Sequence, residues 1–243
     1  MANIVILWVI LCPLVAFLIG SIPFSFLIAK LFTGKDLRKV GTKNVGGLNT
    51  MITAGFWRGF LAGLLDFSKG FFSVLAVILL EFDSSFSSQS VLPRFSIPDM
   101  DAVILILVVA FVVLGHNYSI FLKFKGGRGL GTSAGILVLV NPLVMVIFLV
   151  VFGLLVVLTK HFRPPILFAF ILILPICLFL PLFPPWIVIH GLASNLILTL
   201  VITSIAVVLF PKYIGPTINM FRGKEYKIGN EELTLQEDDS VNL

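Results

Sequence analysis

The sequence predicts an all-α integral membrane protein with about seven transmembrane helices, some of them short or broken. Three observations lead to this prediction. Of the 243 residues, 58% are hydrophobic and only 12% are charged, whereas a soluble domain carries about 25% charged residues. The mean hydropathy is +1.11. The apolar residues lie in long runs separated by polar loops, and most runs approach the roughly 20 residues that a helix needs to cross a bilayer.

The first apolar run extends from about Asn3 to Phe32, which is too long for one straight span. It contains Gly20, Ser21 and Pro23, so we expect a kink there. A broken helix near a membrane face often lines a site, although many membrane helices contain proline with no ligand nearby. The run begins without a basic segment and has no cleavage site, which favours a retained helix over a signal peptide.

A polar loop over residues 33–54 follows the first run. Within it, residues 41–50 read Gly-Thr-Lys-Asn-Val-Gly-Gly-Leu-Asn-Thr, which combines small side chains with hydrogen-bonding ones. Such a loop could wrap a polar head group, or it could form an ordinary turn.

The second apolar segment, from about Ala54 to Leu80, contains two charged residues. Asp66 and Lys69 are three positions apart, so both point to one face of a helix. Charges within a membrane span are costly and usually face a cavity or each other. The sequence therefore leaves two interpretations of these charges open: a structural ion pair and a role in a binding site.

The third segment, from about Met100 to Phe121, leads into a basic loop at residues 123–129, Lys-Phe-Lys-Gly-Gly-Arg-Gly. Glycine lets a ligand approach the backbone, and consecutive N–H groups can form a concave anion site. A helix starting at Gly129 or just beyond would add the positive end of its dipole. We interpret the segment as a phosphate-binding loop at the membrane surface. The alternative is an ordinary basic cytoplasmic loop.

His116 lies close to this loop in the sequence. A lone histidine is more often a hydrogen-bonded structural residue than a catalyst. Its position beside the glycines nevertheless makes it a candidate site residue.

The rest of the chain continues the membrane pattern. Residues 130–158 are apolar but broken at Asn141 and Pro142, which predicts two short helices meeting there. A sixth segment is expected at about 166–182 and a seventh at about 186–210, followed by a basic tail. We expect residues 1–229 to form one transmembrane domain and residues 230–243 an acidic, disordered tail. Cys12 and Cys177 lie in apolar runs and are expected to be unpaired.

The distribution of charge predicts the orientation. The loops at 33–54, 122–129, 159–165 and 211–229 fall on one side of a seven-segment layout and hold most of the Lys and Arg. Arg94 is the only cation on the other side. The positive-inside rule then places the C-terminus in the cytoplasm and the N-terminus outside, for a multi-pass protein of the cell membrane. The net charge of +5 is scattered among short loops and does not indicate nucleic acid.

Four stretches resemble, in order, motifs of the bacterial acyl-phosphate:glycerol-3-phosphate acyltransferases of the PlsY type. Residues 20–23 read Gly-Ser-Ile-Pro, and residues 41–49 are similar to the family's G-S-G-N-x-G-A-T-N. Residues 65–70 match L-D-x-x-K-G. Residues 115–132 follow G-H … F-x-x-F-K-G-G-[KR]-G … T closely.

The resemblance implies transfer of a fatty acyl group from acyl phosphate to the 1-hydroxyl of glycerol 3-phosphate, giving lysophosphatidic acid and phosphate. It implies no cofactor, no metal and no obligate protein partner beyond membrane lipid and the two substrates. The donor is already activated, so no protein nucleophile is required. Catalysis would come from holding the substrates together and stabilising the developing charge.

The candidate site residues follow from these motifs. The candidate catalytic residues are Lys123, His116 and Asn44. The candidate substrate- and phosphate-binding residues are Thr42, Lys43, Gly46, Asn49, Asp66, Lys69, Lys125, Gly126, Gly127, Arg128 and Gly129.

The sequence also departs from the family pattern. Ile52 stands where the first motif continues to an arginine, and Arg163 falls at a serine position. A C-terminal H-x-E-N should fall near residues 213–216, which read Tyr-Ile-Gly-Pro. Arg163, Lys43 or Arg222 could replace the missing phosphate-binding groups. The alternative function is a catalytically degenerate family member that binds lipid phosphate or transports a small anion.

Overall fold

The computed structural model describes residues 2–82, 100–179, 195–225 and 227 of the chain. Within these ranges the chain forms nine α-helices and one short 3-10 helix, and no β-strand. They are α1 (Ala2–Ser21), α2 (Phe24–Thr33), α3 (Gly47–Ala54), α4 (Phe56–Phe82), α5 (Met100–Asn117), η1 (Ile120–Leu122), α6 (Leu130–Val140), α7 (Pro142–Thr159), α8 (Pro164–Phe179) and α9 (Asn195–Phe221). The predicted all-α class is confirmed, and the predicted acidic tail lies outside the described residues.

Among the described residues, five helical stretches are long and apolar enough to cross a membrane: Leu7–Thr33, Phe56–Leu79, Ala102–Leu122, Pro142–Thr159 and Leu196–Phe221. Two shorter apolar helices, Leu130–Val140 and Pro164–Phe179, accompany them. The membrane class agrees with the prediction. The number of spans and the side that each terminus faces stay predictions.

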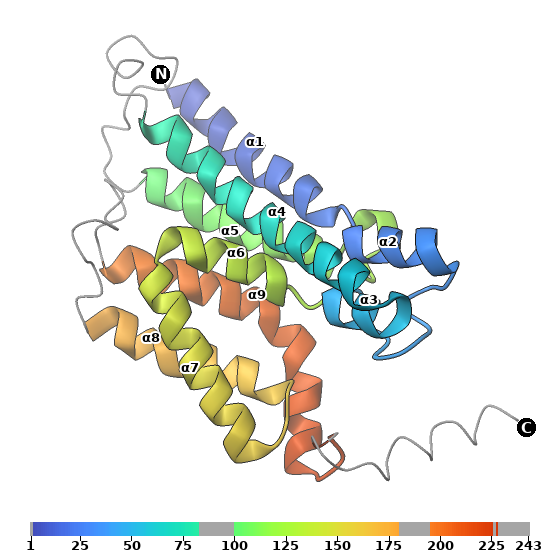
Figure 1. Cartoon of the computed structure of the whole chain (residues 1–243). Helices are drawn as coiled ribbons and strands as arrows, with labels where there is room; N and C mark the ends of the chain where they lie inside the picture. Colours follow the sequence, from blue (N-terminus) through green and yellow to red (C-terminus); the bar gives the residue numbers. More distant parts are fainter. Residues whose placement is uncertain (1, 83–99, 180–194, 226, 228–243) are drawn as a thin grey trace, which may run out of the picture.

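The first apolar run is broken where the sequence predicted a kink. Helix α1 ends at Ser21 and α2 begins at Phe24, with Pro23 at φ −92° and ψ 67° outside helical geometry. Figure 1 shows α2 departing from the line of α1. Backbone polar groups freed by such a break must find other partners inside a membrane, which makes the break a place for polar contacts.

Helices α1 and α5 approach closely because glycine lies at their contact. A Cβ on Gly20 would collide with the Val112 carbonyl, and a Cβ on Gly115 would collide with the Phe17 carbonyl. Small residues allow such close backbone contact between membrane helices. The contact holds the broken end of α1 against the C-terminal end of α5, just before the basic glycine loop.

The predicted break at Asn141 and Pro142 is also confirmed. The Asn141 side chain accepts a hydrogen bond from the Val144 N–H at 3.1 Å, and Pro142 occupies the first turn of α7. Asparagine is favoured at the N-cap of a helix, and proline is favoured in the first turn. Helix α7, expected to be short, has 18 residues and is long enough to span.

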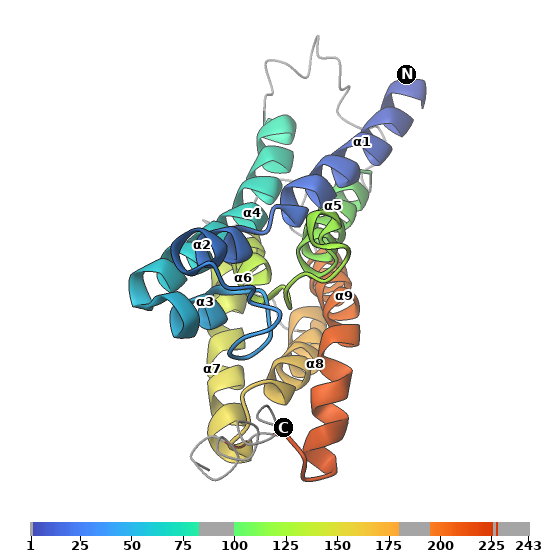
Figure 2. The same cartoon turned by 90° about the vertical axis from the view of Figure 1, so that its right-hand side faces the viewer.

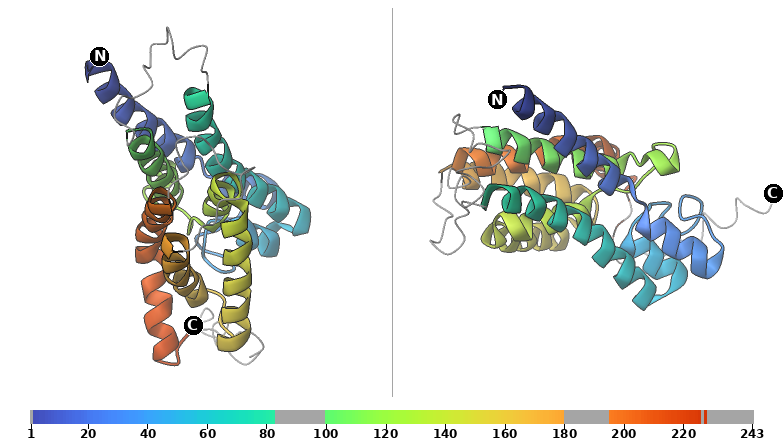
Figure 3. Two further views of the ribbon diagram at one scale, coloured as in Figure 1. Left: turned by 90° about the vertical axis from the view of Figure 1, so that its left-hand side faces the viewer. Right: turned by 90° about the horizontal axis from the view of Figure 1, so that it is seen from above.

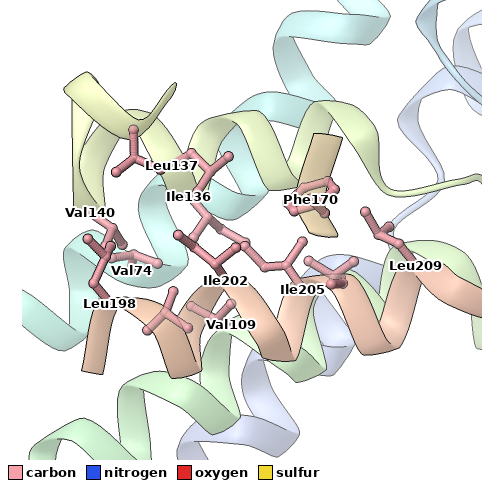
Figure 4. Close-up of a cluster of buried hydrophobic side chains, with 14 of the residues drawn as sticks. Val74, Val109, Ile136, Leu137, Val140, Phe170, Leu198, Ile202, Ile205 and Leu209 are labelled. Atoms are coloured by element: carbon pink, nitrogen blue, oxygen red, sulfur yellow. The ribbon is translucent and has the colours of Figure 1, made fainter. Parts of the chain in front are cut away.

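Side chains from seven of the described helices, α1 and α4 to α9, form the main hydrophobic core. Figure 4 shows Ile202 and Ile205 of α9 among Ile136 of α6, Val109 of α5 and Phe170 of α8. In Figure 3, α8 lies between α7 and α9, which both contact it. Helix α9 therefore has a central place in the bundle. Cys12 and Cys177 are free thiols, as predicted.

Two elements differ from the sequence-based expectation. Residues 47–54 of the predicted polar loop form α3, which lies beside α2 near one end of α4 (Figure 2). Helix α9 continues to Phe221, past the expected end near residue 210 and through Pro211 and Pro216. Each proline removes one helical hydrogen bond, but Tyr213 and Thr217 are buried and their packing maintains the helix.

We expect Gly20→Leu to lower the stability of the folded protein, because the added side chain meets the α5 backbone. Overpacking of this kind costs about 1–3 kcal/mol or more. Gly153→Leu on α7 is the matched control, because a Cβ there meets no atom of the described residues within 4 Å. The measurement is the thermal unfolding midpoint in detergent. Equal midpoints for the two variants would contradict the proposed α1–α5 contact.

Candidate functional site

A buried ion pair lies at the centre of the candidate site. Lys69 Nζ is 2.8 Å from Asp66 Oδ1, and the two side chains are only 2% and 5% exposed. The other carboxylate oxygen accepts a hydrogen bond from Ser25 Oγ at 2.6 Å. Lys69 also donates to the Gly20 carbonyl at 3.4 Å. The pair predicted from spacing is therefore present, and it ties α4 to both sides of the break between α1 and α2.

His116 is the third titratable group in this network. Its Nδ1 lies 3.6 Å from Asp66 Oδ1, and the ring is buried. Thr132 Oγ1 donates to the backbone carbonyl of Asp66 at 3.0 Å. Helices α5 and α6, which flank the glycine loop, are thus both attached to Asp66.

The glycine loop lies directly on the end of α5. The Gly127 N–H donates to the His116 carbonyl at 3.0 Å. A Cβ on Gly127 would collide with the His116 ring and the Val45 carbonyl, and a Cβ on Gly126 would collide with the His116 carbonyl. The absence of side chains at these two glycines allows the loop to lie close to His116 at the end of α5. The left-handed backbone of the loop falls instead at Lys123, Phe124 and Gly129, with φ of 53°, 62° and 77°.

Helix α6 begins at Leu130, immediately after Gly129, as the sequence predicted. The first N–H groups of a helix have no partner within the helix, and they carry the positive end of its dipole. The end of the glycine loop therefore presents backbone donors as well as the Arg128 cation.

A small cavity connects these elements and has about 180 Å³ of empty volume, including its open mouth. Its lining combines the helix break, the ion pair and the glycine loop. The lining residues are Gly20, Ser21, Ile22, Pro23, Val45, Asp66, Lys69, His116, Ser119, Leu122, Gly126 and Gly127. Ser21 Oγ is buried and has no hydrogen-bond partner among the described residues.

The Asn49 side chain holds the loop at residues 41–49 together. Its Nδ2 lies 2.9 Å from the Leu37 and Asn44 carbonyls and 3.1 Å from the Val40 carbonyl. Its Oδ1 accepts from the Thr42 N–H at 2.9 Å. These bonds occupy the amide. The structure therefore gives Asn49 an internal role in this loop, and its contact with a ligand stays a prediction.

The structure brings some of the candidate residues together and separates others. Asp66, Lys69, His116, Gly126 and Gly127 line one cavity. The contact between Val45 and Gly127 places the neighbouring Asn44 and Gly46 on the same side of the molecule as the glycine loop. A larger group lies outside the cavity: Gly129 is buried and Arg128 half-buried, whereas Thr42, Lys43, Lys123 and Lys125 are exposed.

Arg128 is the loop cation with the most altered environment. Burial lowers the pKa of its guanidinium, and the nearby Arg163 charge lowers that pKa further. Glu225 acts in the opposite direction, so the lowered pKa reflects burial first and the surrounding charges second.

Sequence reasoning missed several polar contacts of the site. Ser25 binds Asp66, and the Ser119 hydroxyl donates to the Ser21 carbonyl. The signal available was the presence of hydroxyl side chains within otherwise apolar runs. Glu225, which pairs with Arg163, was missed because the two residues are 62 positions apart.

The described part of the site offers groups suited to anion binding. Over the ranges that the structure describes, no serine or cysteine is hydrogen-bonded to the His116 ring. In the same ranges, no group of three or more His, Cys, Asp or Glu could hold a metal ion. What the site offers is backbone N–H groups, cations and a small polar cavity.

The ion pair generates a stability prediction. We expect Lys69→Met to destabilise the protein by about 3–5 kcal/mol, because it leaves the Asp66 carboxylate buried and unpaired. The double variant Asp66→Leu/Lys69→Met should recover most of this loss, because it removes both charges. Thermal unfolding in detergent measures the effect. Additive losses in the double variant would show that the two charges do not act as a pair.

Comparisons with known proteins identify the family of the chain. The sequence model of the family described as glycerol-3-phosphate acyltransferase matches residues 10–219. The chain is 37% identical over 172 residues to a glycerol-3-phosphate acyltransferase of Mycoplasma mobile, a match that covers 68% of this chain and 66% of that protein. It is 38% identical over 151 residues to glycerol-3-phosphate acyltransferase 2 of Thermotoga maritima, covering 62% of this chain and 68% of the relative. The matches thus span about two thirds of these relatives.

A solved structure shares the fold over almost its whole length. It is the crystal structure of PlsY, an integral membrane glycerol 3-phosphate acyltransferase, in its glycerol 3-phosphate form. The TM-score is 0.66 at 26% identity, and the match covers 93% of this chain and 98% of that one.

Proposed function

The chain belongs to the glycerol-3-phosphate acyltransferase family, and on that premise we propose that it transfers a fatty acyl group from acyl phosphate to the 1-hydroxyl of glycerol 3-phosphate. The products are lysophosphatidic acid and inorganic phosphate. One observation carries the proposal: the helix break, the buried ion pair and the basic glycine loop meet at a single polar cavity. Both substrates carry phosphate, and this part of the molecule offers donors and positive charge for such groups.

The reaction needs little covalent help from the protein. The acceptor hydroxyl attacks the acyl carbonyl carbon, the bond from that carbon to the phosphate oxygen breaks, and phosphate leaves with the electron pair. The hydroxyl proton passes to the departing phosphate or to water. The protein's part is to hold the two substrates in line and to stabilise negative charge on the carbonyl and phosphate oxygens.

The glycine loop supplies the groups that would stabilise negative charge on the substrates. The Gly127 N–H is used by the His116 carbonyl, so the donors for a phosphate come from the first turn of α6 and from the Arg128 side chain. Lys123 and Lys125 are exposed beside this loop and add positive charge at its outer side. Asn44, next to the contact between Val45 and Gly127, supplies a neutral hydrogen bond.

The location follows from the fold and the charge distribution. The protein is a multi-pass membrane protein. We place it in the cell membrane with the glycine loop at the cytoplasmic face, because most Lys and Arg lie in the loops of that side. Acyl phosphate, glycerol 3-phosphate and membrane lipid are its proposed partners, with no nucleic acid and no obligate protein partner.

A second candidate function is a non-catalytic phosphate binder or anion transporter. One observation favours it: residues 213–216, where the family pattern has H-x-E-N, read Tyr-Ile-Gly-Pro and form part of α9. Binding would then persist without acyl transfer.

The activity itself is the first test. Purified protein in detergent, given acyl phosphate and glycerol 3-phosphate, should release phosphate and form lysophosphatidic acid in equal amounts. Acyl-CoA in place of acyl phosphate should give no product, and neither should glycerol in place of glycerol 3-phosphate. Folded protein that binds glycerol 3-phosphate without turnover would favour the second candidate function.

Three substitutions test the site. Lys123→Ala, Gly127→Ala and Asn44→Ala should each lower turnover by roughly a hundredfold, the scale of losing one stabilising donor, while the protein still folds. For Gly127 the cause is the collision of the new Cβ with the His116 ring. Lys39→Ala, an exposed cation outside the site, and Gly215→Ala, where a Cβ meets no described atom within 4 Å, are the controls. Unchanged rates in all three site variants would exclude this site.

A further inference from the structure

Helix α3 has its polar side turned inwards and its apolar side turned outwards. The side chains of Asn49 and Thr50 are buried, whereas those of Leu48 and Ile52 are exposed. A helix at a surface that faces water shows the opposite pattern. Ile52, which stands where the family pattern has an arginine, thus belongs to an outward apolar face. Such a face is suited to apolar surroundings.

Helix α2 and the start of α4 continue this outward apolar face. Leu27 and Leu31 are four positions apart on α2, and both are exposed. At the start of α4, Phe56, Trp57 and Phe60 are exposed and their rings contact one another. Figure 2 shows α2 and α3 together at one side of the bundle. We refer to residues 24–60, which include α2, α3 and the start of α4, as the lobe.

Close contacts hold the lobe together on its inward side. A Cβ on Gly59 of α4 would collide with the backbone of Met51 on α3, so the two helices pack at close distance. Thr50 Oγ1 of α3 donates to the carbonyl of Ser25 on α2 at 3.3 Å. The lobe is therefore one packed unit, and its outward face is the one available to the surroundings.

The lobe carries a strong positive charge as well. Residues 24–60 contain six Lys or Arg and one acid, which gives a net charge of +5, equal to that of the whole chain. The acid, Asp36, pairs with Arg38 at 2.7 Å. Among the described residues, the other five cations are exposed and have no ion pair with a carboxylate: Lys30, Lys35, Lys39, Lys43 and Arg58.

Arg58 connects the aromatic part of the lobe to its basic part. Its guanidinium carbon lies 4.6 Å from the centre of the Phe32 ring at the end of α2. Its Nη1 donates to the Ala54 carbonyl at 2.9 Å. These two contacts hold the guanidinium in place at an exposed position, where its other nitrogens can donate to an anion. A planar guanidinium held in this way is suited to a phosphate group.

The lengths of α2 and α3 indicate how the lobe meets the membrane. With ten and eight residues, they are about 15 Å and 12 Å long, well short of a hydrocarbon core of about 30 Å. Helix α7, by contrast, has 18 residues, none of them charged, and exposes apolar side chains such as Val150. Exposed aromatic residues beside Lys and Arg are typical of the headgroup layer of a membrane.

We propose that the lobe lies in the headgroup layer of the membrane and binds lipids with acidic headgroups there. The outward leucines and Ile52 contact the upper part of the acyl chains, and the rings around Trp57 lie at the boundary. Arg58 and the exposed lysines contact the negative headgroups. The residues of this outward face are separate from the lining of the polar cavity, so the proposal does not depend on the acyl-transfer reaction.

A second copy of this chain is the alternative occupant of the outward face. Two copies that met through their lobes would bring two net charges of +5 together. Like charges placed opposite each other disfavour association. Acidic headgroups instead neutralise the lobe, so the charge favours lipid over a second copy.

Trp57 provides a native fluorescent probe of depth in the membrane. The chain has three tryptophans, so full-length protein carrying Trp8→Phe and Trp186→Phe reports on Trp57 alone. In phospholipid vesicles, bromine atoms near the ester end of the acyl chains should quench this residue more than bromine atoms near the chain end. Trp57→Phe combined with Val150→Trp, at an exposed position within α7, is the control and should show the reverse order. Stronger quenching of Trp57 by the deep bromines, or by neither set, would overturn the proposal.

The choice of lipid tests the role of charge. Brominated phosphatidylglycerol diluted into phosphatidylcholine should quench Trp57 more than brominated phosphatidylcholine at the same mole fraction. Salt at about 1 M should remove the difference, because the screening length falls to about 3 Å. Equal quenching by the two brominated lipids at low salt would overturn the proposed preference for acidic headgroups.

Substitutions of Arg58 assign the preference to the lobe. Arg58→Gln should lower the preference for phosphatidylglycerol by up to about fivefold, the factor expected for one cation near an acidic surface. Arg58→Lys keeps the charge and should retain most of the preference. Lys224→Gln removes an exposed cation after α9 and is the matched control. Equal losses in Arg58→Gln and Lys224→Gln, or no loss in either, would overturn the assignment to the lobe.

Discussion

The ion pair between Asp66 and Lys69 is the interaction on which the rest of the site depends. Two charges inside a membrane helix are tolerated only when every polar atom has a partner. Asp66 meets this requirement by contacting Ser25 of α2, Lys69 of α4 and His116 of α5. Lys69 reaches the carbonyl of Gly20 at the end of α1. Satisfying one pair of charges thus fixes four helices around the polar cavity.

Close backbone contact fixes the glycine loop on this framework. Gly20 and Gly115 bring α1 and α5 together, and Gly127 then lies against the His116 ring at the end of α5. The charged network and the loop meet at His116, whose ring faces Asp66 while its carbonyl accepts from Gly127. The phosphate-binding function proposed for the loop therefore depends on the buried pair, although the pair lies on α4 and the loop follows α5.

Local signals in the sequence predicted much of this arrangement. The break near Pro23, the break at Asn141, the Asp66–Lys69 pair and the start of α6 each depend on a few neighbouring residues, and all are present. Features that depend on distant contacts were not predictable in this way. The continuation of α9 through Pro211 depends on its packing in the bundle.

The hydrogen bonds of Asn49 and the Arg163–Glu225 pair also depend on the folded structure. A motif identifies Asn49 as important, but only the folded loop shows that its amide binds three carbonyls of the same loop. Nothing in the sequence brings Glu225 to Arg163, since the contact needs α8 and α9 to pack together.

The central claim is that the buried pair positions the glycine loop for phosphate. The dissociation constant of inorganic phosphate for the Asp66→Leu/Lys69→Met variant tests this claim most directly, provided that the variant unfolds near the wild-type temperature. The account predicts a folded protein that binds phosphate at least tenfold more weakly, since the His116 ring that lies against Gly127 loses its contact with Asp66. Wild-type phosphate affinity in the folded variant would contradict it.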